Sequence, residues 1–246
     1  MDINQKLTEE LNVKRWQIDA AVKLIDEGNT IPFISRYRKE VTGSLNDEQL
    51  RKLHERLTYL RNLEEKKEQV ISSIEEQGKM TEELHNQILA AETLVTVEDL
   101  YRPYRPKRRT RATIAKEKGL EPFAAYILLQ NAKEPLEETA KQYISEEKEV
   151  KTAAEAIAGA KDIIAESISD NADYRTWIRR TTMKKGKIVS TAKDQESESV
   201  YEMYYEFEEP VPKLAGHRIL ALNRGEKEKF LNVKVEAPED EILTYL

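Results

Sequence analysis

The sequence predicts a mainly α-helical, multihelical fold with helix-turn-helix-like elements and a minor β element near the C-terminus. Three observations support this fold class. Charged residues make up 35% of the 246 residues, against about 25% in a typical domain. Only 8 Gly and 8 Pro interrupt the chain. Apolar residues recur at helical spacing along most of its length, and only residues 230–238 alternate as a strand does. We expect roughly 65% helix, against the usual third.

Residues 3–27 are expected to form a helical hairpin. Apolar residues repeat at helical spacing on both sides of Asn12, in the sets Ile3, Leu7, Leu11 and Ile18, Val22, Ile25. Asn tolerates the left-handed backbone of a tight turn, so the pattern fits a helix-turn-helix. The second helix would then present Lys14 and Arg15 outward, where a nucleic acid can reach them. Simple packing of two amphipathic helices explains the same pattern, and both interpretations stay open.

A long helix is expected over residues 47–77, capped by Asn46 or Asp47. Leucines recur along it at 3-4-3 spacing, at Leu50, Leu53, Leu57 and Leu60. Its outer face alternates in charge, which is typical of a solvated surface. The leucines either pack inside the chain or form a coiled-coil dimer. Because the stripe is short, internal packing is favoured.

A basic loop is expected over residues 101–111, where prolines at 103 and 106 forbid a continuous helix. Its positively charged side chains are Arg102, Arg105, Lys107, Arg108, Arg109 and Arg111. Guanidinium forks match phosphate oxygens, and the neighbouring tyrosines offer faces on which bases stack. The loop is therefore a candidate nucleic-acid contact. Alternatively, it docks on acidic segments of its own chain as a structural clamp.

Charge also separates two later segments. Residues 174–193 hold seven bases and no acid, among them the candidate nucleic-acid contacts Arg179 and Arg180. Residues 194–209 hold seven acids and no base. We therefore expect a multihelical region over 1–193, followed over 194–246 by an acidic, aromatic segment and a small α/β element.

No enzyme signature is present in the sequence. His54, His85 and His217 show no metal-ligand spacing, and no phosphate-binding glycine motif or nucleophile elbow occurs. Cysteine is absent, so disulfides and thiolate metal sites are excluded. We expect no catalytic residue, metal or cofactor. No apolar run approaches the roughly 20 residues that span a bilayer, so we expect a cytoplasmic protein without membrane partners.

Three long segments carry a family resemblance: "GNTIPFISRYRKEVTGSL" (28–45), "EDLYRPYRPKRRTRATIAKEKGLEP" (98–122) and "HRILALNRGEKE" (217–228). In this order they resemble the N-terminal region of the bacterial transcription accessory protein Tex family. Members of that family are longer and carry an RNase H-like domain, helix-hairpin-helix elements and an OB-type RNA-binding domain. The resemblance implies a role in transcription and nucleic-acid binding for this chain, which looks like an N-terminal fragment.

Two positions depart from the family pattern. Gly216 stands where the family usually has Ser before His-Arg, which puts any role of that hydroxyl in doubt. Ser44 stands where a second Gly often follows "VTG", and we expect this change only to stiffen a turn.

The function we expect is a non-catalytic scaffold that binds RNA or DNA weakly, within a transcription accessory protein. The alternative is a protein-interaction scaffold, with RNA polymerase or another transcription protein as the partner and the basic loop as an internal clamp.

Overall fold

The computed structural model describes residues 1–131 and 134–246. About 64% of the structure is helical, and the part described contains one antiparallel sheet of three strands near the C-terminus, so the predicted fold class is confirmed. The chain forms two compact units, Met1–Tyr101 and Arg102–Leu246. The boundary expected at 193/194 falls inside the second unit and stays a prediction. Among the described helices, none has the length and apolar character needed to cross a bilayer.

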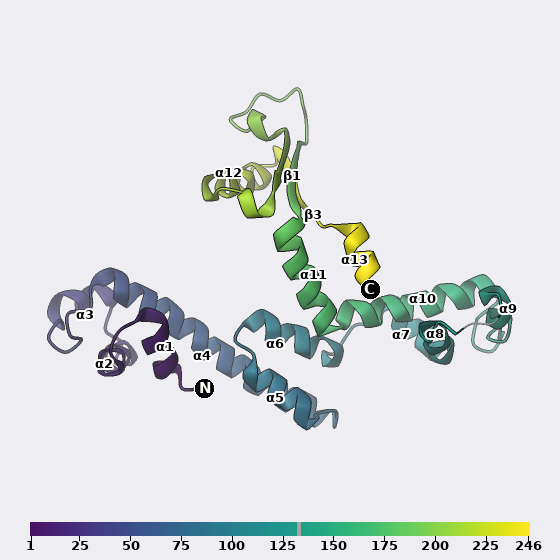
Figure 1. Ribbon diagram of the computed structural model, residues 1–246, viewed down its shortest axis with the longest axis horizontal. Coiled ribbons are helices and arrows are strands. Elements are labelled where there is room, and N and C mark those ends of the chain that lie inside the picture. The colour runs from purple at the N-terminus through teal and green to yellow at the C-terminus, as the bar shows by residue number, and fades with distance from the viewer. Residues whose placement is uncertain (132–133) are drawn as a thin grey trace. The chain divides into compact units, whose positions relative to one another are not determined.

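The first unit consists of helices packed along one long helix (Figure 1). Their bounds are α1 Ile3–Leu11, α2 Arg15–Asp26, α3 Ile31–Tyr37, α4 Asp47–Glu76, α5 Glu82–Ala90 and α6 Leu94–Tyr101. Each of the four leucines in the predicted stripe of α4 is at most 2% exposed within the single chain, without any partner. Packing against α1, α2, α3, α5 and α6 accounts for this burial, so the internal-packing interpretation is confirmed.

Local signals set the ends of these helices as the sequence predicts. Asn46 caps α4: its side chain accepts from the Gln49 N–H at 2.8 Å, and the Gln49 side chain accepts from the Asn46 N–H at 3.0 Å. Asn12 adopts the left-handed conformation, with φ 51°, and ends α1. The helical hairpin over residues 3–27 is therefore present, while its use in reading DNA stays a prediction.

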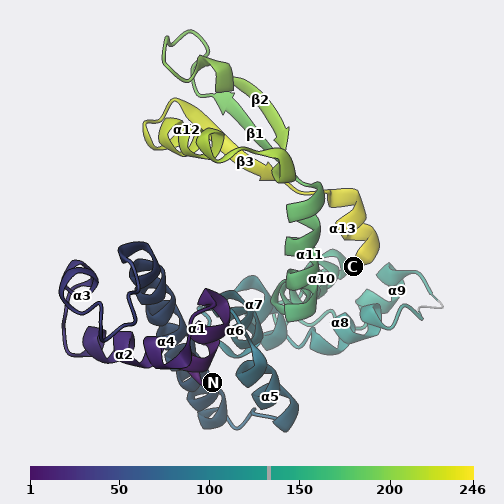
Figure 2. The same cartoon turned by 60° about the vertical axis from the view of Figure 1, so that its left-hand side comes forward.

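The second unit begins with helices gathered around α10 (Figure 2). Their bounds are η1 Arg102–Tyr104 (a 3₁₀ helix), α7 Arg111–Glu117, α8 Glu121–Leu128, α9 Leu136–Lys141, α10 Ala153–Asp170 and α11 Ala172–Lys185. Phe123 is fully buried, and Tyr143 stacks on it at 4.7 Å between ring centroids. Small residues on α10, including Ala156 and Ala160, let α7 and α8 approach closely.

The sheet has the strand order β2-β1-β3 and is followed by the last helix. The elements are β1 Lys187–Ala192, β2 Glu206–Pro210, α12 Gly216–Lys227, β3 Leu231–Glu236 and α13 Glu239–Tyr245. Helix α12 packs on β3, where Leu222 and Leu231 are buried together with Tyr201 and Tyr204. Ser190 is buried on the same face of the sheet as Leu231. Charged residues alternate onto the opposite face, where Lys187 pairs with Glu208.

Only β3 corresponds to a strand predicted from the sequence. Strands β1 and β2 are additions, because "EFEEP" contains a single large apolar residue and the central β1 buries Ser190 where an apolar residue is expected. Their pairing is antiparallel and non-local, with Val189 opposite Glu208 and Lys234. Such pairing stabilises strands whose own sequences give little alternation.

Candidate nucleic-acid interface

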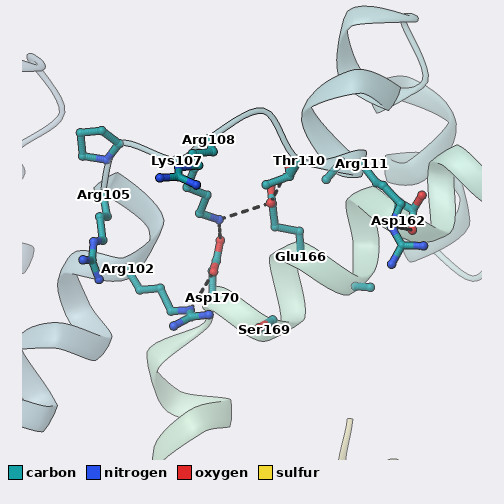
Figure 3. A pocket seen from close by; sticks show the side chains of 13 residues that line it. Arg102, Arg105, Lys107, Arg108, Thr110, Arg111, Asp162, Glu166, Ser169 and Asp170 are labelled. Carbon is teal, nitrogen blue, oxygen red and sulfur yellow. Dashed lines mark hydrogen bonds and ion pairs between the residues drawn. The ribbon is translucent and has the colours of Figure 1, made fainter.

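Two cations of the basic loop are anchored on the C-terminal end of α10. The Arg102 Nε donates to Asp170 Oδ1 at 3.1 Å, and the Lys107 ammonium pairs with the other oxygen of the same carboxylate. Lys107 also lies 3.5 Å from Glu166. In Figure 3 both side chains converge on Asp170. Because Glu166 and Asp170 are four residues apart on one helical face, they form a paired acidic anchor for the loop.

A threonine fixes the C-terminal end of the loop. The Thr110 hydroxyl lies 3.0 Å from Glu166 Oε1, to which it donates, and it accepts from the Thr113 N–H at 3.1 Å. It therefore caps the first turn of α7 and ties that turn to α10 at once. Between the two anchors the loop lies across α10, held by contacts at each end.

The loop and α10 border an open groove of about 580 Å³. Its charged lining comprises five cations and three carboxylates, namely Arg102, Arg105, Lys107, Arg108, Arg111, Asp162, Glu166 and Asp170. The lining thus carries a surplus of two positive charges in a chain whose formal net charge is -6. A local basic surplus of this kind attracts polyanions despite the overall charge.

The cations divide into an anchored set, Arg102 and Lys107, which contact Asp170, and an exposed set; Arg102 belongs to the first by its contact although its side chain is 45% exposed. The side chain of Lys107 is 28% exposed and its partner Asp170 is 12% exposed. In contrast, Arg111 is 87% exposed and lies 4.0 Å from Asp162, and Arg109 is 68% exposed, with its guanidinium 2.7 Å from Glu117. Surface pairs of this second kind contribute at most about 1 kcal/mol, so a phosphate can replace the carboxylate at low cost.

Arg105 and Arg108 belong to the exposed set as well. Both line the groove and are exposed. Arg108 makes no ion pair within residues 1–131 and 134–246. The sequence predicts that the tyrosines of this segment offer faces on which bases stack. Tyr101 does not fit this prediction, because its hydroxyl lies 3.0 Å from that of Ser73 and the Lys66 ammonium lies over its ring. The arginines therefore carry the candidate interface without this ring.

Lys14 and Arg15 lie in the first unit, at the start of α2. Arg15 is already engaged, since it donates at 2.9 Å both to Asp2 and to Asp19. The hydrogen bond from Arg15 holds the pKa of Asp2 below its ordinary range, and the bonds from Asn4 and Arg15 do the same for Asp19. Lys14 is exposed, and its side chain remains available to a ligand.

Arg179 and Arg180 are exposed on α11, which starts two residues after Asp170. Asp170, which holds the basic loop, therefore lies at the junction where α10 ends and α11 begins. Elsewhere on α11, Trp177 stacks on Tyr245 at 3.8 Å between ring centroids, and Lys185 pairs with Glu241 at 2.7 Å. These contacts fix α13 against α11.

Neither the histidines nor the acids form a recognisable centre. His54 and His217 are exposed, and His85 is half-buried. Throughout the described ranges, no group of three or more His, Cys, Asp or Glu is arranged to hold a metal ion. The acidic anchor Glu166–Asp170 was missed at the sequence level. Its signal is the pair of acids at i, i+4 in "ESISD", at the C-terminal end of the helix.

Comparisons with known proteins decide the family. The family model for the Tex-like protein N-terminal domain matches residues 1–75, and the one for the Tex central region-like domain matches residues 130–244. The chain belongs to the Tex family. It is 51% identical to the uncharacterized protein YdcI of Bacillus subtilis over 99% of this chain and 34% of that protein.

Two further relatives show how widely the Tex-family region occurs. The chain is 43% identical to the Transcriptional accessory protein Tex of Neisseria gonorrhoeae, over 99% of this chain and 32% of the relative. It is 31% identical to the human S1 RNA-binding domain-containing protein 1, over 95% of this chain and 24% of the relative. The Tex-family chain thus spans about a third or less of the length of these relatives.

The structure shows where the two departures from the Tex-family pattern lie. Gly216 is the first residue of α12, with Ala215 as the N-cap, and a Cβ at 216 would meet nothing within 4 Å. Ser44 has φ 64°, in the left-handed region that favours glycine. Serine at this position therefore strains the turn in addition to stiffening it.

Proposed function

We propose that this chain is a non-catalytic, nucleic-acid-binding scaffold module of a transcription accessory protein. The observation that carries the proposal is that some cations of the basic loop are held by carboxylates while others are exposed to solvent. Arg102 and Lys107 are held by α10 carboxylates, while Arg108 and Arg111 extend from the same segment into solvent. Anchoring reduces the conformational entropy that the loop loses when it binds, which favours recognition of phosphates.

Arginine suits this role better than lysine would. A guanidinium group offers parallel donors to two phosphate oxygens, and three of the exposed cations, Arg108, Arg109 and Arg111, are arginines within four residues. The contacts are to backbone phosphates, so we propose that RNA and DNA are both bound without strong sequence preference. Arg179 and Arg180 on α11 would extend the same basic surface. Lys14 would provide a separate contact in the first unit.

Membership in the Tex family supports the same conclusion at a coarser level. One relative bears the name Transcriptional accessory protein Tex, and the human relative is named for an S1 RNA-binding domain. We propose that transcription proteins, including RNA polymerase, are partners of the helical scaffold, and that this region contributes positioning and charge without catalysing a reaction.

A protein-interaction scaffold remains the second candidate, favoured by a specific observation. The pairs from Arg102 and Lys107 to Asp170 are those that an internal clamp requires. The two functions depend on different residues, so substitutions can distinguish them. The clamp depends on Lys107, whereas nucleic-acid contact depends on Arg108, Arg109 and Arg111.

A salt titration tests the proposal. Binding of a labelled single strand of about 12 nucleotides is measured by fluorescence anisotropy at several salt concentrations. Each phosphate contact contributes about 0.7 to the log–log salt slope on single strands and about 0.9 on duplex. The triple variant Arg108→Gln, Arg109→Gln, Arg111→Gln should flatten the single-strand slope by about two units.

The matched control removes the same amount of charge elsewhere. Arg51→Gln, Lys52→Gln and Lys79→Gln neutralise three exposed cations of the first unit. This control should leave the slope within about half a unit of the parent protein. Equal flattening by both triple variants would indicate a diffuse effect of net charge and reject the loop as the binding surface.

A further inference from the structure

A second group of exposed cations and aromatic rings lies in the first unit, on the end of α3, the turn after it and the start of α2, which packs on that turn. We call it the RYRK patch, and its members are Trp16, Arg36, Tyr37, Arg38 and Lys39. All five side chains are exposed, and the two large rings of Trp16 and Tyr37 are 50% and 65% exposed. Large aromatic residues left in solvent are typical of interaction surfaces.

The turn that carries the patch is built rigidly. The Gln17 amide donates to the carbonyls of Thr42 and Gly43 at 3.2 and 3.0 Å. Thr42 is fully buried, and its hydroxyl donates to the Arg38 carbonyl at 3.2 Å. Gly43 has φ 61°, and a Cβ there would come within 2.3 Å of the Trp16 ring. Trp16 therefore packs on the turn with one edge while half of its surface faces solvent.

The charges of the patch are unusual for this unit because carboxylates do not neutralise them. Most other cations of the unit are in ion pairs, namely Lys6, Arg15, Arg51, Lys52, Arg56, Arg61, Lys66 and Lys67. Arg36, Arg38 and Lys39 form no ion pair with any described residue. Arg38 instead lies over the Phe33 ring, 5.0 Å from its centroid, and donates to the Tyr37 carbonyl.

We propose that the RYRK patch is a separate contact surface for single-stranded nucleic acid. Its cations would bind successive phosphates, and the exposed faces of Trp16 and Tyr37 would stack on unpaired bases. Duplex bases are already stacked, so they cannot use these rings. A purely acidic peptide would use the cations alone, because its side chains offer no flat face to stack on the two rings. The proposal does not depend on the basic loop, which lies in the other unit.

The chain provides its own reporter for this surface. It has two tryptophans, Trp16 and Trp177, so the variant Trp177→Phe leaves only the indole of the patch. Titration with an unlabelled oligothymidine or oligouridine should quench Trp16 emission in a saturable way, because a stacked base quenches indole fluorescence. A duplex of the same length should quench it at least fivefold less effectively, since a lost stack weakens binding by roughly 5- to 150-fold.

Two variants in the Trp177→Phe background locate the binding. The triple variant Arg36→Gln, Arg38→Gln, Lys39→Gln should abolish the quenching, and Tyr37→Leu should weaken it roughly 5- to 150-fold. The loop variant Arg108→Gln, Arg109→Gln, Arg111→Gln should still show it. Far-ultraviolet circular dichroism and thermal melting establish that each variant is folded.

Three results would overturn the proposal. Oligonucleotide binding seen by anisotropy without any change in Trp16 emission would place the ligand elsewhere. Quenching by polyglutamate equal to that by the oligonucleotide would identify the patch as a site for acidic proteins. Quenching that survives the RYRK triple variant but disappears in the loop variant would assign the signal to the basic loop.

Discussion

Replacing Lys107 by Met tests the anchoring of the basic loop most simply. Methionine keeps most of the length and apolar stem of lysine but removes the ammonium that pairs with Asp170 and approaches Glu166. The carboxylates of Asp170 and Glu166 then lose the cation that they share, while Arg102 still pairs with Asp170. We therefore expect the second unit to lose stability.

The magnitude follows from how exposed the three groups are. Leaving a fully buried charge without its partner costs about 3–5 kcal/mol, whereas an exposed pair contributes at most about 1 kcal/mol. Lys107, Asp170 and Glu166 are 28%, 12% and 23% exposed, which places this cluster between the two limits. We expect a loss of about 2 kcal/mol, or a melting temperature lower by about 4–8 °C.

Tryptophan fluorescence can follow the two units separately. Trp177 lies on α11, in the second unit, and Trp16 lies in the first. In a Trp16→Phe background, urea unfolding followed by Trp177 emission reports the free energy of unfolding of the second unit. Arg111→Gln is the matched control, because this side chain is 87% exposed and should cost less than about 0.5 kcal/mol.

Equal effects of the two substitutions would refute this reasoning. If Lys107→Met is as mild as Arg111→Gln, the contacts to Asp170 contribute nothing to stability and the loop is not anchored by charge. A large loss in both would show that Arg111 serves the fold as well as Lys107, which would contradict its assignment to nucleic-acid contact.

Four further predictions concern other parts of the chain. Leu57→Ala should destabilise the first unit by about 2–5 kcal/mol in urea unfolding, because Leu57 is 2% exposed inside the α4 core; a folded but newly monomeric variant in sedimentation would contradict this. Ser190→Ala should leave stability unchanged or raise it by about 1 kcal/mol, since the fully buried hydroxyl has no hydrogen-bond partner in the described residues; a clear loss would reveal a partner. The Arg56 hydrogen bonds hold the pKa of Glu10 below its ordinary value of 4.5, so the pair stabilises the first unit above that pH and loses this contribution as the pH falls through the lowered pKa. Acid unfolding followed by Trp16 emission should show this loss, and Arg56→Gln should make the unit less sensitive to pH in this window. The purified chain should cleave neither RNA nor DNA with or without divalent metal; cleavage that is lost on replacing an Asp or Glu of this chain would disprove the non-catalytic assignment.

Local patterns predict the parts of the fold that local chemistry determines. The leucine spacing of α4 indicates a buried stripe because a helix brings these positions onto one face. Asn46 and Asn12 are recognisable as a cap and a turn residue because their side chains suit those backbone conformations. The family resemblance likewise rests on residues that are contiguous in the sequence.

Non-local contacts are what the sequence alone leaves undetermined. Lys107 and Asp170 are 63 residues apart, and nothing in either segment indicates that they meet. The charge pattern therefore shows that the loop is basic but does not show which cations are held and which are exposed. Strand β2 is missed for a similar reason. It is held by pairing with β1, which precedes it across an acidic loop, and its own sequence shows little alternation of apolar and polar residues.

Photocrosslinking tests the central claim, nucleic-acid contact by the basic loop, most directly. A single strand carrying 4-thiouracil is crosslinked to the chain, which is then cleaved after glutamate and mapped by mass spectrometry. The peptide 99–117 contains the whole set of loop cations, and the peptide 28–40 contains Arg36, Tyr37, Arg38 and Lys39. The account predicts adducts on peptide 99–117 that disappear when Arg108, Arg109 and Arg111 are replaced by Gln. Adducts confined to other peptides, or unaffected by this triple substitution, would contradict it.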